Sequence, residues 1–449
     1  MSVKFALTTL LLSLMLTTAA RAESLTDALI SAYRHSGLLE QNRALLRAAD
    51  EDVAQSVADL RPVVGYALSS TYSALTSSTT GNLQLSASML IHDFGRSHLR
   101  VDVAKENVLA LREALVGVEQ SVLLRAVSAY VGVQRDAAIV SLRENNVRLI
   151  TQELRAANDR FEVGAVTRTD VAIAEARLAS AQSARAAASG DLTMAREEYR
   201  AATGHYPGEL LPPPALPATA ETLDSARAVA RQKHPDMLQA QRSVKISELN
   251  IAIAAGSVKP ALSGTALVSI DQDGTESGSV GLTFSGPIYQ GGALASAHRQ
   301  AAAQRDISRA GLHITRLAVD QNVGNAWSQL AVAKVELQAT EQQIRAARVA
   351  FRGVREEAML GARTTLDVLN AEQELLDAEA SKVSAQTDRY IAAYDLLAAM
   401  GLLTVNHLRL GIATYDPAAY YNAVKSAPTY RVSPQGKKLD SLLKALGKN

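Results

Sequence analysis

The chain has 449 residues, and 46 Lys and Arg against 45 Asp and Glu give a formal net charge of +1. This balance gives no electrostatic case for binding nucleic acid or an anionic surface. Cysteine is absent, which excludes disulfides, thiolate metal sites, cysteine nucleophiles and a lipidated cysteine anchor. Aromatic residues make up only 4% while Ala, Leu, Gln, Arg and Glu dominate long stretches, a composition that favours long packed helices over one globular core.

The N-terminus has the layout of a secretory signal peptide. Lys4 precedes an apolar run from Phe5 to Leu16, and a small-residue stretch ends in Ala20-Arg21-Ala22. We predict that residues 1–22 are cleaved and that the mature chain starts at Glu23. A transmembrane anchor is the weaker alternative, because the apolar run of about 12 residues is short of the roughly 20 that span a bilayer. We expect no later stretch of about 18 apolar residues, and so an exported protein that is not a helical membrane protein.

The mature sequence contains two copies of one unit. Residues 23–205 and 221–402 align at an offset of 197 or 198, and the matches run along the whole length: Leu25 with Leu223, Pro62 with Pro260, Gly95 with Gly292, Tyr130 with Trp327, Asp170 with Asp367, and Gly204 with Gly401. A ladder of matches at one offset indicates an internal duplication. Residues 206–220 are a Pro-rich connector. Residues 403–449 form a C-terminal segment whose basic end, 437–448, is predicted to be mobile.

Each copy predicts a helix, two short strands, a very long helix and a shorter return helix. In the first copy a helix runs from a Ser24 cap through Val57, with Asp27 completing a capping-box-like start. The other predicted elements of the first copy are strands 63–74 and 82–91 around a polar turn at 76–81, a helix at 96–162 and a return helix at 170–202. The second copy predicts strands 261–270 and 279–288 around a turn at 271–274, a helix at 293–360 and a return helix at 367–399.

The long helices lack proline and turn back at Gly164 and Gly361. At 1.5 Å per residue each would run roughly 100 Å. Such helices bury their apolar stripe against neighbours in a coiled-coil manner, and a bundle closed in a ring leaves a hollow.

Four strands of about 10 residues have the length of transmembrane β-strands. Four strands cannot close a barrel, since the smallest membrane barrels use about eight, and an open edge cannot face lipid. We therefore expect several chains to contribute strands to one barrel. The alternative is a soluble pair of hairpins packed on the helices of an exported scaffold.

Three stretches carry a family resemblance: VGLTFSGPIYQGG at 280–292, RFEVGAVTRTDV at 160–171 and LGARTTLDVL at 360–369. Together they resemble the strand-to-helix signature and the two helix-turn tips of the TolC family of outer-membrane factors. The match covers nearly the whole mature chain in order, and the three motifs are specific together, whereas Gly-x5-Asp-Val alone would be weak.

The resemblance implies a mixed fold, a membrane β-barrel plus a long α-helical coiled-coil barrel, in which a homotrimer joins four strands per protomer into a 12-stranded barrel. The connector and the C-terminal segment would belong to a girdling equatorial domain. The resemblance also implies a place in the outer membrane of a Gram-negative bacterium, with a large periplasmic part. The function implied is passive export, of proteins by type I secretion or of drugs and small molecules by efflux. Export would follow docking to a periplasmic adaptor (membrane fusion protein) and an inner-membrane ABC or RND-type transporter, with no cofactor.

The resemblance further implies a gate at the two tips. Asp367 matches the acidic, pore-lining position, Arg363 the link-forming arginine, and Thr169 and Asp170 its partners on the first tip; three copies of Asp367 would form a negative ring that favours cations. Asn370 stands where the family pattern has a second aspartate, and Ala358 where it has a tyrosine. We therefore predict a ring with about half the acidic charge, weaker block by polyvalent cations and an easier-opening gate. The adaptor-contacting residues implied are Val163, Gly164, Ala165, Leu360, Gly361 and Ala362.

Plainer interpretations stand beside these. Asp170 and Asp367 follow glycine turns and suit helix capping, a role that is compatible with a pore role. Tyr130 and Trp327 are predicted to pack at a helix interface. The histidine spacing predicts no metal site, and the absence of a nucleophile elbow or phosphate loop predicts that the protein is not an enzyme. The rival function is a non-transporting exported coiled-coil scaffold or adhesin. The cargo, the cognate pump and the choice between secretion and efflux do not follow from the sequence.

Overall fold

The computed structural model describes residues 22–428 together with Lys438 and Ser441. The predicted signal peptide and the predicted mobile tail therefore lie outside the described residues, apart from Ala22, Lys438 and Ser441.

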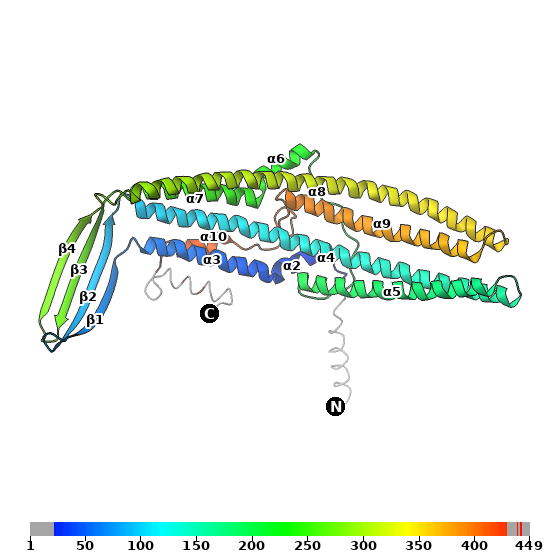
Figure 1. Ribbon diagram of the computed structural model, residues 1–449, viewed down its shortest axis with the longest axis horizontal. Coiled ribbons are helices and arrows are strands. Elements are labelled where there is room, and N and C mark those ends of the chain that lie inside the picture. Colours follow the sequence, from blue (N-terminus) through cyan, green and yellow to red (C-terminus); the bar gives the residue numbers. More distant parts are fainter. Residues whose placement is uncertain (1–21, 429–437, 439–440, 442–449) are drawn as a thin grey trace, which may run out of the picture. The chain divides into compact units, whose positions relative to one another are not determined.

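The elements follow the predicted order twice along the chain (Figure 1). The first copy contains α2 (Leu25–His35), α3 (Gly37–Ala58), β1 (Val63–Ser73), β2 (Ser78–His92), α4 (Arg96–Glu162) and α5 (Arg168–Thr203). The second copy contains α6 (Leu223–Lys233), α7 (Pro235–Gly256), β3 (Ala261–Asp271), β4 (Glu276–Ser285), α8 (Ala293–Met359) and α9 (Thr365–Ala399). A short helix, α10 (Pro417–Val424), follows in the C-terminal segment. The internal duplication is therefore present in the structure as well as in the sequence.

The prediction of one helix from Ser24 through Val57 is wrong, because two helices occupy this stretch. Ser36 adopts an extended backbone conformation that ends α2, and α3 begins at Gly37. The second copy breaks at the equivalent place, where Pro235 occupies the first turn of α7. Glycine is a poor residue for a helix interior, and proline lacks the amide hydrogen that a continuing helix needs. The Ser24 capping box is confirmed: the Ser24 hydroxyl accepts from the Asp27 amide, and the Asp27 carboxylate accepts from the Ser24 amide at 3.1 Å.

The strands differ from the prediction mainly at their ends. β2 begins at Ser78, so most of the predicted polar turn at 76–81 is strand. β4 begins at Glu276 and ends at Ser285, three residues before the predicted end at Ile288. Pro287 lies in the missing portion, and proline cannot donate a hydrogen bond to a neighbouring strand. The long helices agree with the prediction to within one residue at either end.

The chain divides into two compact units, and each unit takes parts of both copies. Of the described residues, unit 1 contains 22–38, 119–230 and 321–412, and unit 2 contains 39–118, 231–320 and 413–428. Helices α4 and α8 each contribute a segment to both units.

In unit 2, helix α10 of the C-terminal segment packs on α3. Tyr420 of α10 is buried with Ala54 and Val424, and its hydroxyl donates to the Glu51 carboxylate at 2.6 Å. The Arg61 guanidinium donates to the carbonyl oxygens of Ser426 and Ala427. Polar and apolar contacts thus fix α10 against the helix that leads into the sheet.

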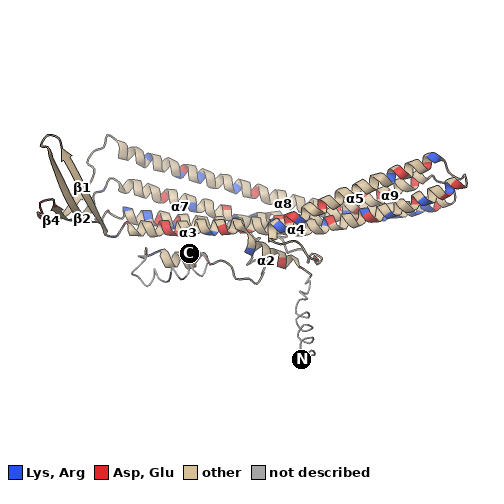
Figure 2. Cartoon of the chain, turned by 90° about the horizontal axis from the view of Figure 1, so that it is seen from below, with Lys and Arg blue, Asp and Glu red and all other residues tan. Residues whose placement is uncertain are grey.

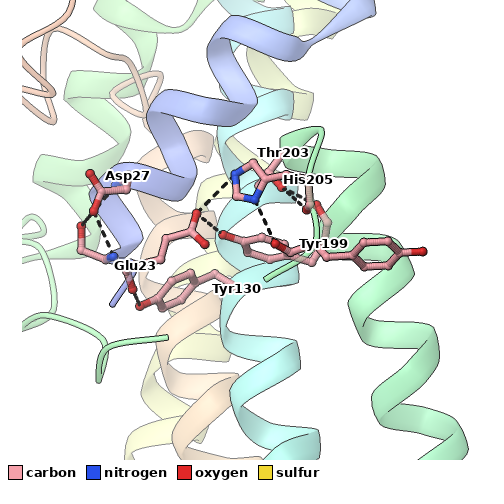
Figure 3. A network of polar contacts seen from close by, with 8 residues as sticks. Glu23, Asp27, Tyr130, Tyr199, Thr203 and His205 are labelled. Atoms are coloured by element: carbon pink, nitrogen blue, oxygen red, sulfur yellow. Dashed lines mark hydrogen bonds and ion pairs between the residues drawn. The ribbon is translucent and has the colours of Figure 1, made fainter. Parts of the chain in front are cut away.

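In unit 1, the start of the described chain is held in a polar network (Figure 3). The Glu23 carboxylate accepts a hydrogen bond from the buried Tyr199 hydroxyl at 2.6 Å and lies 3.5 Å from His205 Nε2. The Glu23 backbone forms an isolated parallel β-bridge with Leu210 of the connector. Burial raises the pKa of Tyr199, and the hydrogen bond from Tyr199 to Glu23 raises it further, so Tyr199 stays a donor.

The equivalent aromatic positions Tyr130 and Trp327 differ in burial. Tyr130 is fully buried, and its hydroxyl lies 2.6 Å from the Leu211 carbonyl oxygen. Trp327 is half-buried. The packing predicted for Tyr130 is thus confirmed, and the hydroxyl additionally anchors the connector.

Helix α4 bears on the expectation that no apolar stretch of about 18 residues follows the N-terminal one. By length and composition alone it contains an 18-residue window apolar enough to cross a membrane, with a mean hydropathy of 1.3, and 44% of that window is buried within the protein. Buried residues of α4 in unit 1 include Leu123, Val127 and Tyr130. Partial burial of this kind is equally typical of a helix in a packed core.

Candidate functional site

The four strands form one antiparallel sheet in unit 2, in the order β1-β2-β3-β4 (Figure 1). Because successive side chains of a strand point to opposite faces, the pairing register sorts the side chains into two sets. Tyr66 lies opposite Leu85, which lies opposite Val268. These three residues therefore share one face of the sheet.

That face is apolar and exposed. Most of its large members are more than a third exposed: Val64, Tyr66, Leu68, Tyr72, Leu83, Leu85, Met89, Val268, Ile270, Val280, Leu282 and Phe284. An exposed apolar surface that follows every strand of a sheet marks a surface that meets lipid or another protein. No helix of the described chain covers these side chains.

The opposite face is polar and almost uncharged. One row across the sheet reads Ala67, Gln84, Ser269 and Ser277, and the next row towards the β1-β2 turn includes Ser69 and Asn82. Among the four strands, Asp and Glu occur only beside the β3-β4 turn, at Asp271 on this face and at Glu276, which pairs with Ile270 on the apolar face, and Lys and Arg are absent. Figure 2 shows the contrast with the helices, along which charged residues of both signs recur. Apolar residues on one face and polar residues on the other are the pattern of a transmembrane β-barrel wall.

The sheet has two free edges. β1 pairs only with β2, and β4 pairs only with β3. Each outer strand therefore has a row of backbone amide and carbonyl groups without a partner in the sheet, and exposing such a row to lipid is costly. This wall needs further strands on both sides.

The helical tips lie in unit 1 and are a second candidate site. Both tips turn on a glycine with positive φ, +74° at Gly164 and +79° at Gly361. At the first tip, the amides of Gly164 and Ala165 donate to the last turn of α4, and at the second tip the amide of Ala362 donates to the Glu357 carbonyl. The predicted adaptor-contacting residues Val163, Gly164, Ala165, Leu360, Gly361 and Ala362 are all exposed.

Capping boxes begin both return helices. The Thr167 hydroxyl accepts from the Asp170 amide while the Asp170 carboxylate accepts from the Thr167 amide at 2.9 Å. Thr364 and Asp367 repeat this arrangement, again with 2.9 Å between the carboxylate and the threonine amide. Hydrogen bonds from Thr167 lower the pKa of Asp170, and those from Thr364 lower the pKa of Asp367. The capping interpretation is therefore confirmed for both aspartates, and both carboxylates stay ionised.

The remaining predicted gate residues make contacts that the sequence did not reveal. Arg363 Nε donates to Glu357 Oε2 at 2.8 Å on its own tip, and this hydrogen bond raises the pKa of Arg363. Asn370 Oδ1 accepts from Arg177 Nη2 of α5 at 2.9 Å. Asn370 thus joins the return helices of the two copies. Thr169 is exposed in the first turn of α5, and its predicted link with Arg363 stays a prediction.

Sequence reasoning missed Thr167, Thr364, Glu357 and Arg177. The two threonines could have been found, since Thr-x-x-Asp before an apolar-periodic stretch is a capping-box signal. The contact between Arg177 and Asn370 has no comparable signal, because 193 residues separate the pair.

In the part of the chain that the structure describes, no group of three or more His, Cys, Asp or Glu is arranged to hold a metal ion. The chain also contains no cysteine.

Comparison with known proteins finds relatives that match both copies of the unit. The family model described as "Outer membrane efflux protein" matches residues 30–205 and again 226–402, one match per copy. The chain is 35% identical over 417 residues to the outer membrane efflux protein BepC of Brucella suis, with 91% of each chain covered. It is 26% identical over 430 residues to the outer membrane protein TolC of Escherichia coli, covering 87% of this chain and 84% of TolC.

A solved structure of CusC has the same fold, with a TM-score of 0.75 at 18% identity over 85% of this chain and 92% of CusC. This likeness confirms the mixed fold of membrane strands and long helices. The family match and the relatives BepC and TolC confirm the TolC-type resemblance and the outer-membrane location. The chain belongs to the outer membrane efflux protein family, whose members are channels.

Proposed function

We propose that three copies of this chain form a closed duct through which substrates leave the cell passively. The observation that carries the proposal is the two-faced sheet with two free edges. Three copies of a four-stranded wall would close a 12-stranded barrel with its apolar face towards lipid and its polar face lining an aqueous lumen. The uncharged Ser, Thr, Asn and Gln side chains of that lining suit the passage of chemically varied solutes.

Closure fixes the neighbour of each edge strand. β1 runs antiparallel to β4 in the sheet order, so β1 of one copy can pair with β4 of the next. Since both faces must continue across the junction, Leu68 of one copy has to lie opposite a residue of the apolar set of β4, such as Val280 or Leu282. It cannot lie opposite Thr283, which points to the lumen face.

Cysteine pairs test this arrangement, because the chain contains no native cysteine. Leu68→Cys is combined with Val280→Cys, Leu282→Cys or Phe284→Cys, and the matched control combines it with Gly281→Cys or Thr283→Cys. Within one chain the two edge strands are three strand spacings apart, roughly 14 Å, which is too far for a disulfide. We expect at least one apolar-face pair to give disulfide-linked species that end at the trimer, and no cross-linking in the controls. Cross-linking only in the controls, or a ladder that continues beyond three, would contradict the closed trimer.

Fractionation separates the duct from the rival exported scaffold or adhesin. A duct predicts a heat-modifiable trimer in the outer membrane. A soluble periplasmic or secreted monomer would exclude the duct.

We propose efflux of drugs and small molecules ahead of protein secretion, because the Brucella relative that shares 35% identity is named an efflux protein. The tips would dock to a periplasmic adaptor coupled to an inner-membrane ABC or RND-type transporter, with Val163 and Leu360 as exposed apolar contacts. Asp367, Arg363, Asn370, Asp170 and Thr169 would form the gate. Deletion of the gene followed by drug-susceptibility and secretome comparison tests the cargo: increased susceptibility supports efflux, and loss of a secreted protein with unchanged susceptibility supports type I secretion.

A further inference from the structure

Glu372 of α9 is a buried acidic residue in unit 1, two residues beyond Asn370. Only 5% of its surface is exposed, and its carboxylate Oε1 accepts a hydrogen bond from Asn146 Nδ2 of α4 at 3.0 Å. Asn146 is equally buried at 5%. One helical turn away on each helix, Ile150 and Leu369 are buried in a common apolar cluster with residues of α5. The pair is therefore a polar contact inside an otherwise apolar junction between the two copies.

The charged groups around Glu372 do not neutralise it. On α4, Glu153 adds a second negative charge, and on α8, Arg355 lies 4.0 Å from Glu153 rather than on Glu372. On α5, Arg177 is bonded to Asn370. In the described part of the chain, no Lys or Arg forms an ion pair with Glu372. The pKa of Glu372 is raised to about 7, chiefly by burial and to a lesser extent by the charge of Glu153, while the Asn146 hydrogen bond and Arg355 act in the opposite direction.

We propose that Glu372 and Asn146 form a proton-controlled latch that holds α9 to α4 when Glu372 is protonated and releases it when the proton leaves. A neutral carboxylic acid can donate its O–H to the amide oxygen of Asn146 while it accepts from the amide nitrogen, which gives two hydrogen bonds. The ionised form only accepts, and it leaves a buried charge without a cation.

The direction of the pH effect follows from linkage. A carboxyl group whose pKa is raised in the folded state binds its proton more tightly there than when exposed. The latch is therefore strongest below the ordinary pKa of a glutamate, weakens as the pH rises towards about 7, and changes little above that. Only the consequence for transport, easier opening of the tips at neutral and alkaline pH, rests on the proposed duct.

Amide hydrogen exchange of the full-length protein in detergent tests the latch independently of transport. Wild type and Glu372→Gln are compared with each other at pH 5.5 and again at pH 8.5, so that the pH dependence of chemical exchange cancels. At pH 8.5 we expect residues 365–376 to exchange on the order of tenfold faster in wild type than in Glu372→Gln, whose amide is always neutral. At pH 5.5 we expect this difference to disappear.

The matched control is Glu374→Gln, which neutralises an exposed carboxylate in the same helix and should change exchange at neither pH. An equal effect of Glu372→Gln at both pH values, or no effect at either, would overturn the latch. A second measurement reports the protonation state of Glu372. The infrared difference spectrum between wild type and Glu372→Gln should show one carboxylic acid band that titrates near pH 7. A band that is absent at pH 5.5 would overturn the proposal. Failure of the trimer test above would leave these outcomes interpretable, because neither measurement depends on a closed duct.

Discussion

The two helical tips are built alike and charged differently. Each tip has a glycine with positive φ and a Thr-x-x-Asp capping box at the start of the return helix. Between glycine and threonine, however, the first tip carries Val166 and the second carries Arg363, which bonds Glu357. Turn geometry is thus preserved in both copies while the charge has diverged. This difference teaches that the tips share a structural requirement but not an electrostatic one.

The largest expected effect tests the shared requirement. Gly164→Ala and Gly361→Ala should each destabilise their tip by about 1–2 kcal/mol, because alanine is disfavoured at positive φ. The readout is amide exchange of the tip and of the adjoining helix turn. The matched control is Gly190→Ala in the interior of α5, where a Cβ meets nothing within 4 Å and alanine should stabilise the helix by up to about 1 kcal/mol. A large effect at only one tip would show that the two tips do not share the requirement for glycine.

The capping boxes come next. Thr167→Ala and Thr364→Ala should each cost about 1 kcal/mol of local stability, because the amide of the third helical residue loses its acceptor. Thr→Ser at the same positions keeps the hydroxyl and should restore protection of the first turn of α5 or α9 against amide exchange. Ser variants that exchange as fast as the Ala variants would contradict a capping role.

The divergent position tests the electrostatic difference. In the proposed duct, Arg363→Val makes the second tip resemble the first and removes a cation from the neighbourhood of Asp367, so cation selectivity should rise. Val166→Arg should have the opposite effect. Reversal potentials in planar bilayers under a salt gradient measure both. Unchanged potentials in the two variants would show that this position lies away from the conducting path.

A smaller effect is expected at Asn370. Asn370→Asp adds the missing acidic charge, but Arg177 lies within hydrogen-bond distance and would pair with it, for up to about 1 kcal/mol between exposed groups. We expect only a modest increase in block by polyvalent cations from Asn370→Asp alone and a larger increase in the double variant with Arg177→Gln. The single variant Arg177→Gln is the control for loss of the link. If charge at this position altered neither block nor conductance, Asn370 would have no part in the gate.

The smallest effect concerns pH. Hydrogen bonds lower the pKa values of Asp170 and Asp367. The stability that the two ionised carboxylates contribute is therefore present above the ordinary pKa of an aspartate and is lost only in stronger acid. The exchange difference between Thr364→Ala and wild type should therefore be the same at pH 5 and pH 7. By contrast, the contact between Glu372 and Asn146 should weaken as the pH rises from 5 to 7. A cap that weakens between pH 7 and pH 5 would contradict this assignment.

The sequence by itself determined the features that repeat over short distances. Strand alternation, proline-free helical stretches and an offset of 197 or 198 are properties of neighbouring residues or of the ordered chain, so they predicted the duplication, the long helices and the incomplete barrel. Even the tip caps were readable in principle, since a Thr and an Asp three residues apart meet whenever a helix starts there.

Only the tertiary structure decided which distant side chains meet. Arg177 reaches Asn370 across 193 residues and Asn146 reaches Glu372 across 226. Glu23 likewise meets Tyr199 of α5 across 176 residues of sequence. The physical reason is that a helix's own periodicity fixes which of its residues share a face, whereas the rotation and height at which two helices pack depend on the whole set of side chains between them.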